Sequence, residues 1–526
     1  MCLPGQRDGA RRWYDFFVDF LKEKYNALPC AVQPSVVRID DGGPLQLHVD
    51  DVLFFLDEEF LTEKFLPILK EKFKVSIHYA PRSGGSFEFL KKTFVVSENY
   101  ETITIVSETK HIEQMYKTFC NVDGRTVRLY DTPMAPQQFA VDTTPALDEL
   151  KAGTYRSLVG ALLYISHDRA DIQFAAKTLA ASLKTPTVDA WLKLRRVTGY
   201  LKKTECQVIT LRQSRLNASL FSKLNDDEEV GAEYLLLESF SGSDWGGSSG
   251  CKSTASAAHV LAGNCIHTSS RSQKAISLSS TESEWYAALS ASIDALYLRH
   301  ILEHLQFNVK NFLRIDNSAV ISISQKMGVS RLRHIEGKLL WLQSKVSSGE
   351  LQPKSVGTAW NVSDIGTKPL GKEKFLLFKF LLGYEENGKP VGEECYWRLL
   401  QEDRVKVKIK SVKRIMRELQ QESSEEHLRS QVSAFANLFC DPESSAVRRL
   451  IFMAFLQGAA AVTPTSEDIS SPWSGLALSL VAMAMVVVVF VVGYYVLVRY
   501  VKMCVTQHYE LLELVFYVSL EGSCYV

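Results

Sequence analysis

The order of segments between Tyr234 and about Leu370 constrains the fold of this chain most. Short apolar runs alternate here with segments of helical periodicity, in the order strand, strand, helix, strand, helix, strand. That order is typical of an α/β layer. Because 526 residues exceed what one hydrophobic core can hold, we expect this region to be one of three or four domains.

Single acids stand at the ends of apolar runs in this region. They occur in SGSDWGG, STESEWYAAL, LRIDNSAV and WNVSDIGTKPL, as Asp244, Glu284, Asp316 and Asp364. We expect Asp316 to close a strand, and Glu284 to project from a helix start that Ser280 and Thr281 cap. Any one of these acids alone is more commonly a cap or a solvated surface residue. Four acids in this order make a candidate site for Mg²⁺, which prefers hard oxygen ligands.

A second candidate site is the acid pair in LQLHVDDVLFF. Asp50 and Asp51 are flanked on both sides by apolar residues, and buried acids are costly unless a cation pairs with them. The alternative for an isolated pair is an ordinary hairpin turn, where aspartate is common. Around the pair, residues 10–135 alternate amphipathic helices at Trp13–Tyr25 and Glu58–Phe73 with β-rich runs.

The middle of the chain is helical. Residues 136–153 form a polar linker that contains Pro136, Pro145 and Gly153. Apolar residues then recur at helical spacing from 154 to 204, with Pro186 at the turn between two helices.

Taken together, these segments resemble the C-terminal part of copia-type LTR retrotransposon Pol polyproteins. The sequence His48-Val49-Asp50-Asp51 is similar to the Tyr-Val-Asp-Asp box of their reverse transcriptases, with His in place of Tyr. The four later acids resemble the Asp-Glu-Asp-Asp centre of type I ribonucleases H. The resemblance implies a multidomain α/β fold, with a truncated reverse transcriptase palm and thumb at 10–135, the linker at 136–153, a helical connection at 154–233 and a ribonuclease H-like mixed sheet with helices at 234–370.

The resemblance also implies chemistry for both sites. Ribonucleases H of this type use two Mg²⁺ ions, which Mn²⁺ can replace, to hydrolyse RNA in RNA/DNA hybrids. Glu284, Asp316 and Asp364 occupy matching ligand positions, and Arg271 and Lys274 match contacts to the hybrid's phosphates. The palm aspartates would hold Mg²⁺ for RNA-dependent DNA synthesis. Too few residues precede them for the first palm strand, so a separate chain would have to supply that half.

The first ribonuclease position departs from the family pattern. The family reads Ser-Asp-x-Asp-Trp, whereas this chain has Gly242 at the expected ligand and keeps only Asp244. Asp244 would lie on the same face of its strand, displaced by about 6.6 Å. We therefore expect weak or absent nuclease activity, with Asp244 as a poor substitute.

The C-terminal part departs from the family altogether. Residues 371–470 form a charged region of unknown fold, and residues 499–526 form a tail. Between them, residues 475–498 are apolar and long enough for a transmembrane helix, which predicts contact with a lipid bilayer and a single-pass membrane localisation, although the ancestral enzyme would be cytoplasmic or nuclear.

Two functions remain open at this point. The first is a retrotransposon-derived reverse transcriptase and ribonuclease H whose activity is impaired in this copy. The second is a catalytically inactive, membrane-anchored relic or nucleic-acid-binding protein. Equal numbers of basic and acidic residues, 60 of each, give no net positive field, so any affinity for nucleic acid must come from local patches.

Overall fold

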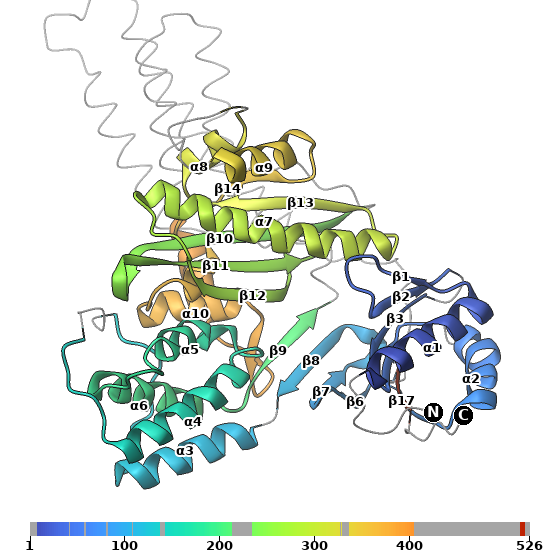
Figure 1. Ribbon diagram of the computed structural model, residues 1–526, viewed down its shortest axis with the longest axis horizontal. Helices are drawn as coiled ribbons and strands as arrows, with labels where there is room; N and C mark the ends of the chain where they lie inside the picture. The colour runs from blue at the N-terminus through green and yellow to red at the C-terminus, as the bar shows by residue number, and fades with distance from the viewer. Residues whose placement is uncertain are drawn as a thin grey trace, which may run out of the picture. The chain divides into compact units, whose positions relative to one another are not determined.

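The computed structural model describes residues 8–40, 43–56, 59–79, 83–107, 109–136, 142–212, 234–326, 328, 336–403 and 516–520 (Figure 1). Residues 1–395 and 512–526 belong to one compact unit, and residues 396–511 to a second. The described residues of the first unit form three sheets with helices packed on them.

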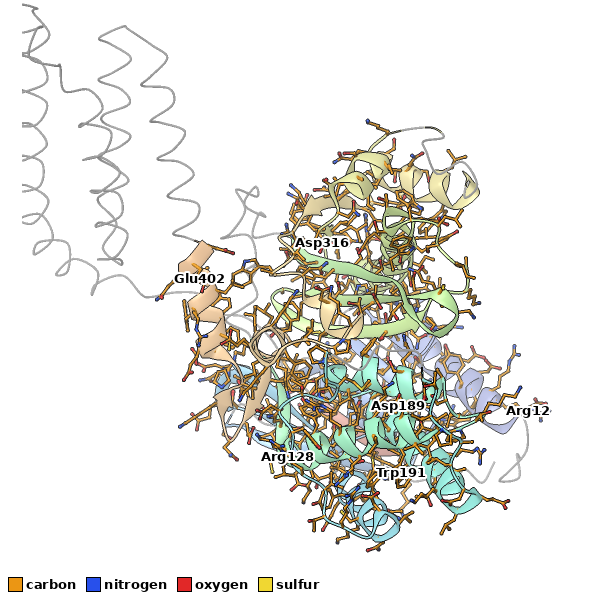
Figure 2. The ribbon with its side chains drawn as sticks, turned by 90° about the vertical axis from the view of Figure 1, so that its left-hand side faces the viewer. Arg12, Arg128, Asp189, Trp191, Asp316 and Glu402 are labelled. Atoms are coloured by element: carbon orange, nitrogen blue, oxygen red, sulfur yellow. The ribbon has the colours of Figure 1, made fainter. Side chains whose placement is uncertain are left out.

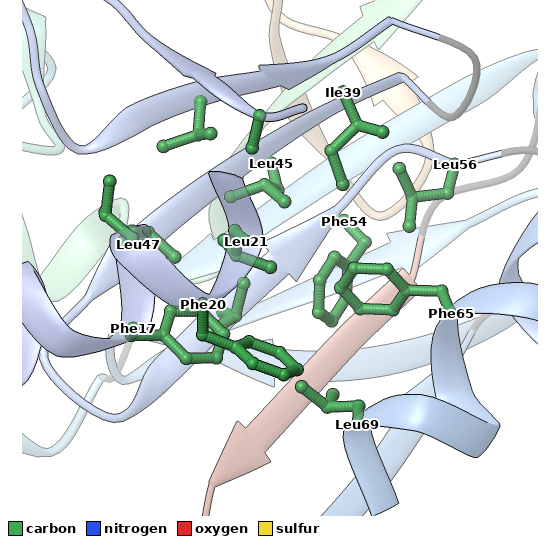
Figure 3. Close-up of a cluster of buried hydrophobic side chains, with 14 of the residues drawn as sticks. Phe17, Phe20, Leu21, Ile39, Leu45, Leu47, Phe54, Leu56, Phe65 and Leu69 are labelled. Carbon is green, nitrogen blue, oxygen red and sulfur yellow. The ribbon is translucent and has the colours of Figure 1, made fainter. Parts of the chain in front are cut away.

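The N-terminal sheet is six-stranded, in the order β1-β2-β3-β4-β17-β5. Its strands are β1 Leu28–Pro29, β2 Val36–Ile39, β3 Gly43–His48, β4 Asp51–Phe54, β5 Val75–Tyr79 and β17 Phe516–Leu520. Helices α1 (Gly9–Tyr25) and α2 (Leu66–Lys72), the latter preceded by the π-helical segment η1 (Phe60–Phe65), pack their apolar faces on it. Figure 3 shows Phe17 and Phe20 of α1 near Leu69 of α2. Both helices predicted in this region are therefore confirmed.

A second six-stranded sheet has the order β16-β15-β9-β8-β7-β6. Its strands are β6 Gly85–Phe89, β7 Lys92–Val96, β8 Thr102–Ser107, β9 Gln207–Arg212, β15 Tyr384–Glu386 and β16 Lys389–Pro390, and the short helix η2 (Glu98–Tyr100) connects β7 to β8. These strands come from three separate stretches of the sequence. In a region for which the sequence predicted no fold, β15 thus pairs with β9, and β16 pairs with β15.

Helices fill the region between β8 and β9, and those from residue 154 to 204 were predicted, whereas α3 was not and α4 begins inside the predicted linker. They are α3 Lys110–Asp123, α4 Glu149–Ile165, η3 Ala170–Ile172, α5 Gln173–Ala180 and α6 Val188–Lys203. Asp148 caps α4 and Thr187 caps α6, each by accepting a backbone N–H from the first turn. Pro186 lies between α5 and α6, where its sequence predicted a turn.

The third sheet has five strands in the order β12-β11-β10-β13-β14. The two pairings β12–β11 and β11–β10 are antiparallel, whereas β10–β13 and β13–β14 are parallel. The strands are β10 Leu235–Ser248, β11 Lys252–Leu261, β12 Asn264–Ser272, β13 Val309–Ile315 and β14 Gln352–Ser355, with the one-turn helix η5 (Ser249–Cys251) between β10 and β11. The mixed sheet is the one the resemblance implies. The sequence pattern overlooked one of the three strands that precede the first helix.

Helices cover this sheet. The long helix α7 (Ser280–His304) runs along it in Figure 1, and its alanines and Trp285 pack on Leu313 and Ile315. Helices α8 (Ser318–Ser324) and α9 (Glu336–Ser347) follow β13, and η7 (Val362–Gly366) and α10 (Lys372–Leu381) follow β14. Two helices thus replace the single predicted one between the last two strands.

The predicted fold class requires one correction, at its membrane helix. In the part of the chain that the structure describes, no helix is both long and apolar enough to cross a bilayer. Residues 475–498, on which the prediction rested, lie outside the described residues. An apolar run shows that a helix there could span a membrane, but not that such a helix forms. The described residues have a mixed α/β fold, and the predicted transmembrane helix and single-pass localisation are withdrawn.

Candidate functional site

The aspartate pair Asp50 and Asp51 lies at a tight hairpin. His48 at the end of β3 pairs with Asp51 at the start of β4, and Val49 and Asp50 form the turn between them. Val49 has a φ of 56°, in the left-handed region that a β-branched residue seldom adopts. The indole of Trp13 donates a hydrogen bond of 2.6 Å to the carbonyl of Val49, which ties the turn to α1. The hairpin is the geometry that the resemblance implies for this box.

The four later acids reach one end of the third sheet from four elements. Asp244 lies on β10, Glu284 on the second turn of α7, Asp316 directly after β13 and Asp364 in η7. Figure 2 labels Asp316 at this end of the strands. The prediction that Asp316 closes a strand is confirmed.

The cap of α7 differs from the predicted one. Ser279, not Ser280 or Thr281, accepts the backbone N–H of Glu282 at 3.2 Å, and the carboxylate of Glu282 accepts the backbone N–H of Leu278 at 2.7 Å. This reciprocal arrangement starts the helix one residue earlier than predicted. Glu282 is thereby engaged at the cap, which leaves Glu284 as the acid that faces β10.

Glu284 is held at the edge of β10 and is strongly perturbed. Its Oε1 accepts the backbone N–H of Ser243 at 3.2 Å, and its Oε2 is buried without a hydrogen-bond partner among the described residues. Burial, with the added charges of Asp316 and Asp364, raises the pKa of Glu284 to about 7. A buried carboxylate oxygen without a donor indicates a place for a cation.

Asp316 lies in an environment like that of Glu284. Burial and the charge of Asp364 raise its pKa, while hydrogen bonds from Asn361 and Thr358 act in the opposite direction. Mutual repulsion shows that Glu284, Asp316 and Asp364 lie within electrostatic reach of one another. The charges of the three acids that the sequence matched cleanly therefore interact, although no three acids of the described residues lie close enough to surround a metal.

Gly242 faces the segment that carries Asp364. A Cβ added at Gly242 would lie 2.6 Å from the hydroxyl of Ser363 and 3.5 Å from the amide nitrogen of Asn361. Asn361 donates to the carbonyl of Ser241 at 2.9 Å, and Ser363 donates to Asn361 at 2.7 Å. A side chain at position 242 would therefore enter the space that the Ser363 hydroxyl now fills, next to the amide of Asn361.

Asp244 replaces that missing side chain only in part. It lies one strand period farther along β10, and its carboxylate folds back against the backbone of Gly247. Burial and the charge of Asp364 raise its pKa, against the opposing charges of Lys368 and Lys177. The charge of Asp244 thus interacts with the charges of the site, although its side chain lies at the edge of the site.

Three lysines that the sequence reasoning missed surround these acids. The Nζ of Lys368 lies 3.1 Å from Oδ1 of Asp364, and the Nζ of Lys374 lies 2.8 Å from Oδ2. Lys177 of α5 donates to the hydroxyl of Thr254 at 2.6 Å, and burial lowers its pKa to about 8 although Asp244 opposes the shift. The spacing of Asp364 and Lys368 could have indicated their ion pair. No local pattern indicates Lys177.

The two predicted phosphate contacts lie beside the start of α7. Arg271 on β12 is exposed and has its guanidinium 3.5 Å from Asp294. Lys274 is exposed in the loop that follows, next to Gln273, whose amide donates to the carbonyl of Ser283 at 2.8 Å. Trp245 fixes the same loop by donating to the carbonyl of Ser277 at 2.9 Å. A nucleic-acid backbone could reach both basic side chains.

These side chains fit one divalent cation and not two. Glu284, with its buried Oε2, and Asp316 suit a single Mg²⁺, which commonly takes one or two protein carboxylates with water and phosphate. For a second cation, Gly242 offers no ligand, and Lys368 and Lys374 pair with both oxygens of Asp364. Within the described ranges, no three His, Cys, Asp or Glu side chains lie close enough to surround a metal, either here or at the Asp50–Asp51 hairpin.

Comparison with known proteins finds polyproteins of plant transposons among the relatives. No protein-family model matches the chain. The retrovirus-related Pol polyprotein from transposon TNT 1-94 of Nicotiana tabacum is 24% identical over 398 residues, which covers 73% of this chain and 28% of that protein. The corresponding polyprotein from transposon RE2 of Arabidopsis thaliana is 26% identical over 352 residues, with 64% and 21% covered. The chain thus spans about a quarter of the length of these relatives.

A shorter relative and a solved structure complete the comparison. An uncharacterized mitochondrial protein of Arabidopsis thaliana is 27% identical over 251 residues, which covers 47% of this chain and 91% of that protein. Among solved structures, LC11-RNase H1, isolated from compost by a metagenomic approach, is 16% identical, covers 26% of this chain and 93% of its own, and has a TM-score of 0.20.

Proposed function

We propose that the carboxylate site of this chain binds RNA/DNA hybrids. The chain is a relative of the retrovirus-related Pol polyproteins of plant transposons, which confirms its resemblance to the copia-type family. In general terms, its function is like that of a reverse transcriptase and a ribonuclease H. We further propose that Gly242 impairs hydrolysis at the site.

The orientation of Gly242 carries the proposal. Its missing side chain would enter beside Ser363 and Asn361, in the segment that carries Asp364. Burial and the charges of Asp316 and Asp364 raise the pKa of Glu284, so these three acids interact. This supports the proposal that an acid is missing at position 242.

The chain's own residues set up the remaining chemistry. Ser243 orients Glu284 through its backbone N–H, and Asn361 and Thr358 orient Asp316. A bound Mg²⁺, or Mn²⁺ in its place, would be held by Glu284 and Asp316 and would supply Lewis acidity toward the phosphate and its attacking water. With a pKa of about 7, Glu284 can also take up a proton near neutral pH.

The Asp50–Asp51 hairpin supports a narrower role. It presents two acids, whereas nucleotidyl transfer in the related polymerases uses three. RNA-directed DNA synthesis would therefore require a third acid besides this pair.

One observation favours a second candidate function, hybrid binding without any hydrolysis. Lys368 and Lys374 pair with both oxygens of Asp364, so this acid is neutralised without a metal. Such a site would still bind phosphate through the lysines that surround it, but it would not hydrolyse the hybrid.

Hybrid binding can be tested through the exposed Lys274. We expect the full chain, with Ca²⁺ in place of Mg²⁺, to bind a labelled RNA/DNA hybrid more tightly than duplex DNA of the same sequence. Lys274→Met should weaken hybrid binding about three- to tenfold and lower the salt dependence by about one phosphate contact. The matched control is Lys326→Met, which removes an exposed lysine just after α8. Equal affinity for hybrid and duplex DNA, or equal effects of the two substitutions, would contradict the proposal.

A further inference from the structure

A buried ionic network joins the helical connection to the elements that follow the third sheet. The guanidinium of Arg169 binds the carboxylate of Asp171 through two hydrogen bonds of 2.9 and 2.8 Å. The Nζ of Lys379 on α10 lies 3.1 Å from the same carboxylate, and the hydroxyl of Tyr384 on β15 donates to it at 3.0 Å. Asp171 is 2% exposed and Lys379 is 1% exposed. Since a buried charge without its partners is costly, the network holds the start of α5 against α10 and β15.

Two polar contacts hold the same region against β12. Gln173 at the start of α5 donates to the carbonyl of Thr268 at 3.3 Å. At the end of β9, the backbone N–H of Arg212 donates to Asn264 at 2.8 Å, and Asn264 donates back to the carbonyl of Arg212 at 3.0 Å. Helix α5 is therefore held against β12 through Gln173, and β9 is held against the start of β12 through Asn264.

Lys177 extends from this fixed helix to the strand that carries Gly242. Its Nζ lies 2.6 Å from the hydroxyl of Thr254. On the adjoining strands, Thr254 pairs with Asp244, and Ser256 pairs with Gly242. Because cross-strand partners share a face and side chains alternate with period two, the ammonium group reaches the face on which Gly242 and Asp244 lie.

We propose that Lys177, supplied by the helical connection, is a phosphate-binding residue of the carboxylate site, on the side where Gly242 leaves no ligand for a cation. The proposal rests on the proposed function, since it assigns a further contact to the same hybrid. A lysine ammonium is a compact positive charge with three donors, which suits a nonbridging phosphate oxygen. Lys368, which follows η7, and Lys374 of α10 pair with Asp364, and Lys177 adds a positive charge on the β10–β11 side of the site.

The experiment measures binding of a labelled RNA/DNA hybrid by the full chain with Ca²⁺ at several salt concentrations. We expect Lys177→Met to weaken binding about five- to twentyfold and to lower the salt dependence by about one phosphate contact, and Lys177→Arg to restore most of both. Lys184→Met is the matched control, because Lys184 is an exposed lysine that follows the same helix. The Lys184→Met substitution removes one positive charge, as Lys177→Met does, but it does not affect the contact with Thr254.

A merely structural role for Lys177 gives a different result. In that case Lys177→Met would lower the unfolding midpoint while leaving the salt dependence of hybrid binding like that of Lys184→Met, which would overturn the proposal. Absence of hybrid binding by the unsubstituted chain would overturn the proposed function together with this inference. Hybrid binding that is equally strong in Lys177→Met and Lys184→Met would overturn the inference alone.

Discussion

At the scale of single residues, the acids of the site were predictable and the lysines were not. Glu284, Asp316 and Asp364 stand in short motifs whose order the sequence displays, and their charges interact in the structure. Lys177 meets Thr254 across 77 residues of sequence. A contact of that separation depends on how α5 packs against the sheet, and no local periodicity encodes it.

The raised pKa of Glu284 leads to a prediction about stability. Its usual value is 4.5 and its value in the folded chain is about 7. Since the folded state holds the proton more tightly, this group's contribution to stability is fully present below the unfolded pKa and is lost as pH rises toward 7. We expect the free energy of unfolding to fall by roughly 2 to 3 kcal/mol across this window on account of Glu284.

Replacing the carboxyl group with an amide should remove that dependence. Glu284→Gln should show a flatter profile between pH 4.5 and 7 than the unsubstituted chain, measured by denaturant unfolding at both ends of the window. Glu149→Gln, an exposed acid in the first turn of α4, serves as the control. Parallel profiles for the unsubstituted chain and Glu284→Gln would show that the acid is not perturbed in this way.

At the scale of elements, buried charge distinguishes the third sheet from an ordinary apolar core. Arg314 on β13 is fully buried and donates to Glu238 on β10 at 2.9 and 2.6 Å. Phe312 of the same strand lies 5.2 Å from the guanidinium. The sequence predicted the strand, but its pattern could not show that a charged residue in the middle would point inward toward a partner 76 residues away.

This pair yields a prediction at the same scale. Arg314→Met should destabilise the chain by about 3 to 5 kcal/mol, because Glu238 would be left buried beside an apolar side chain. The double substitution Arg314→Met with Glu238→Leu should recover most of the loss, as measured by denaturant unfolding. A double variant as unstable as the sum of both single variants would indicate that the two residues act independently.

At the scale of the whole molecule, the linear order of segments did not predict which segments pack together. Strand β15 returns to pair with β9, and β17 pairs with β4 and β5. These pairings join strands that are distant in the sequence, whose registers follow from packing and not from local pattern. The prediction of a membrane helix at 475–498 rested on composition alone, and those residues lie outside the described ones.

The proposed loss of hydrolysis depends most directly on Gly242, which we assign to the position of a missing acid. Ser363 now fills the space that an aspartate would enter, since its hydroxyl lies 2.6 Å from the added Cβ while its own Cβ lies at an ordinary 3.7 Å. The double substitution Gly242→Asp with Ser363→Ala therefore provides both the carboxylate and the room for it. Unfolding midpoints of each variant establish that the compared chains are folded.

The decisive measurement is the rate at which the full chain cleaves a labelled RNA/DNA hybrid with Mg²⁺, with and without this double substitution. We predict an increase of about two orders of magnitude in the double variant, abolished when Asp316→Asn is added to it. A folded double variant that cleaves no faster than the unsubstituted chain, or cleavage that survives Asp316→Asn, would contradict the assignment of this site.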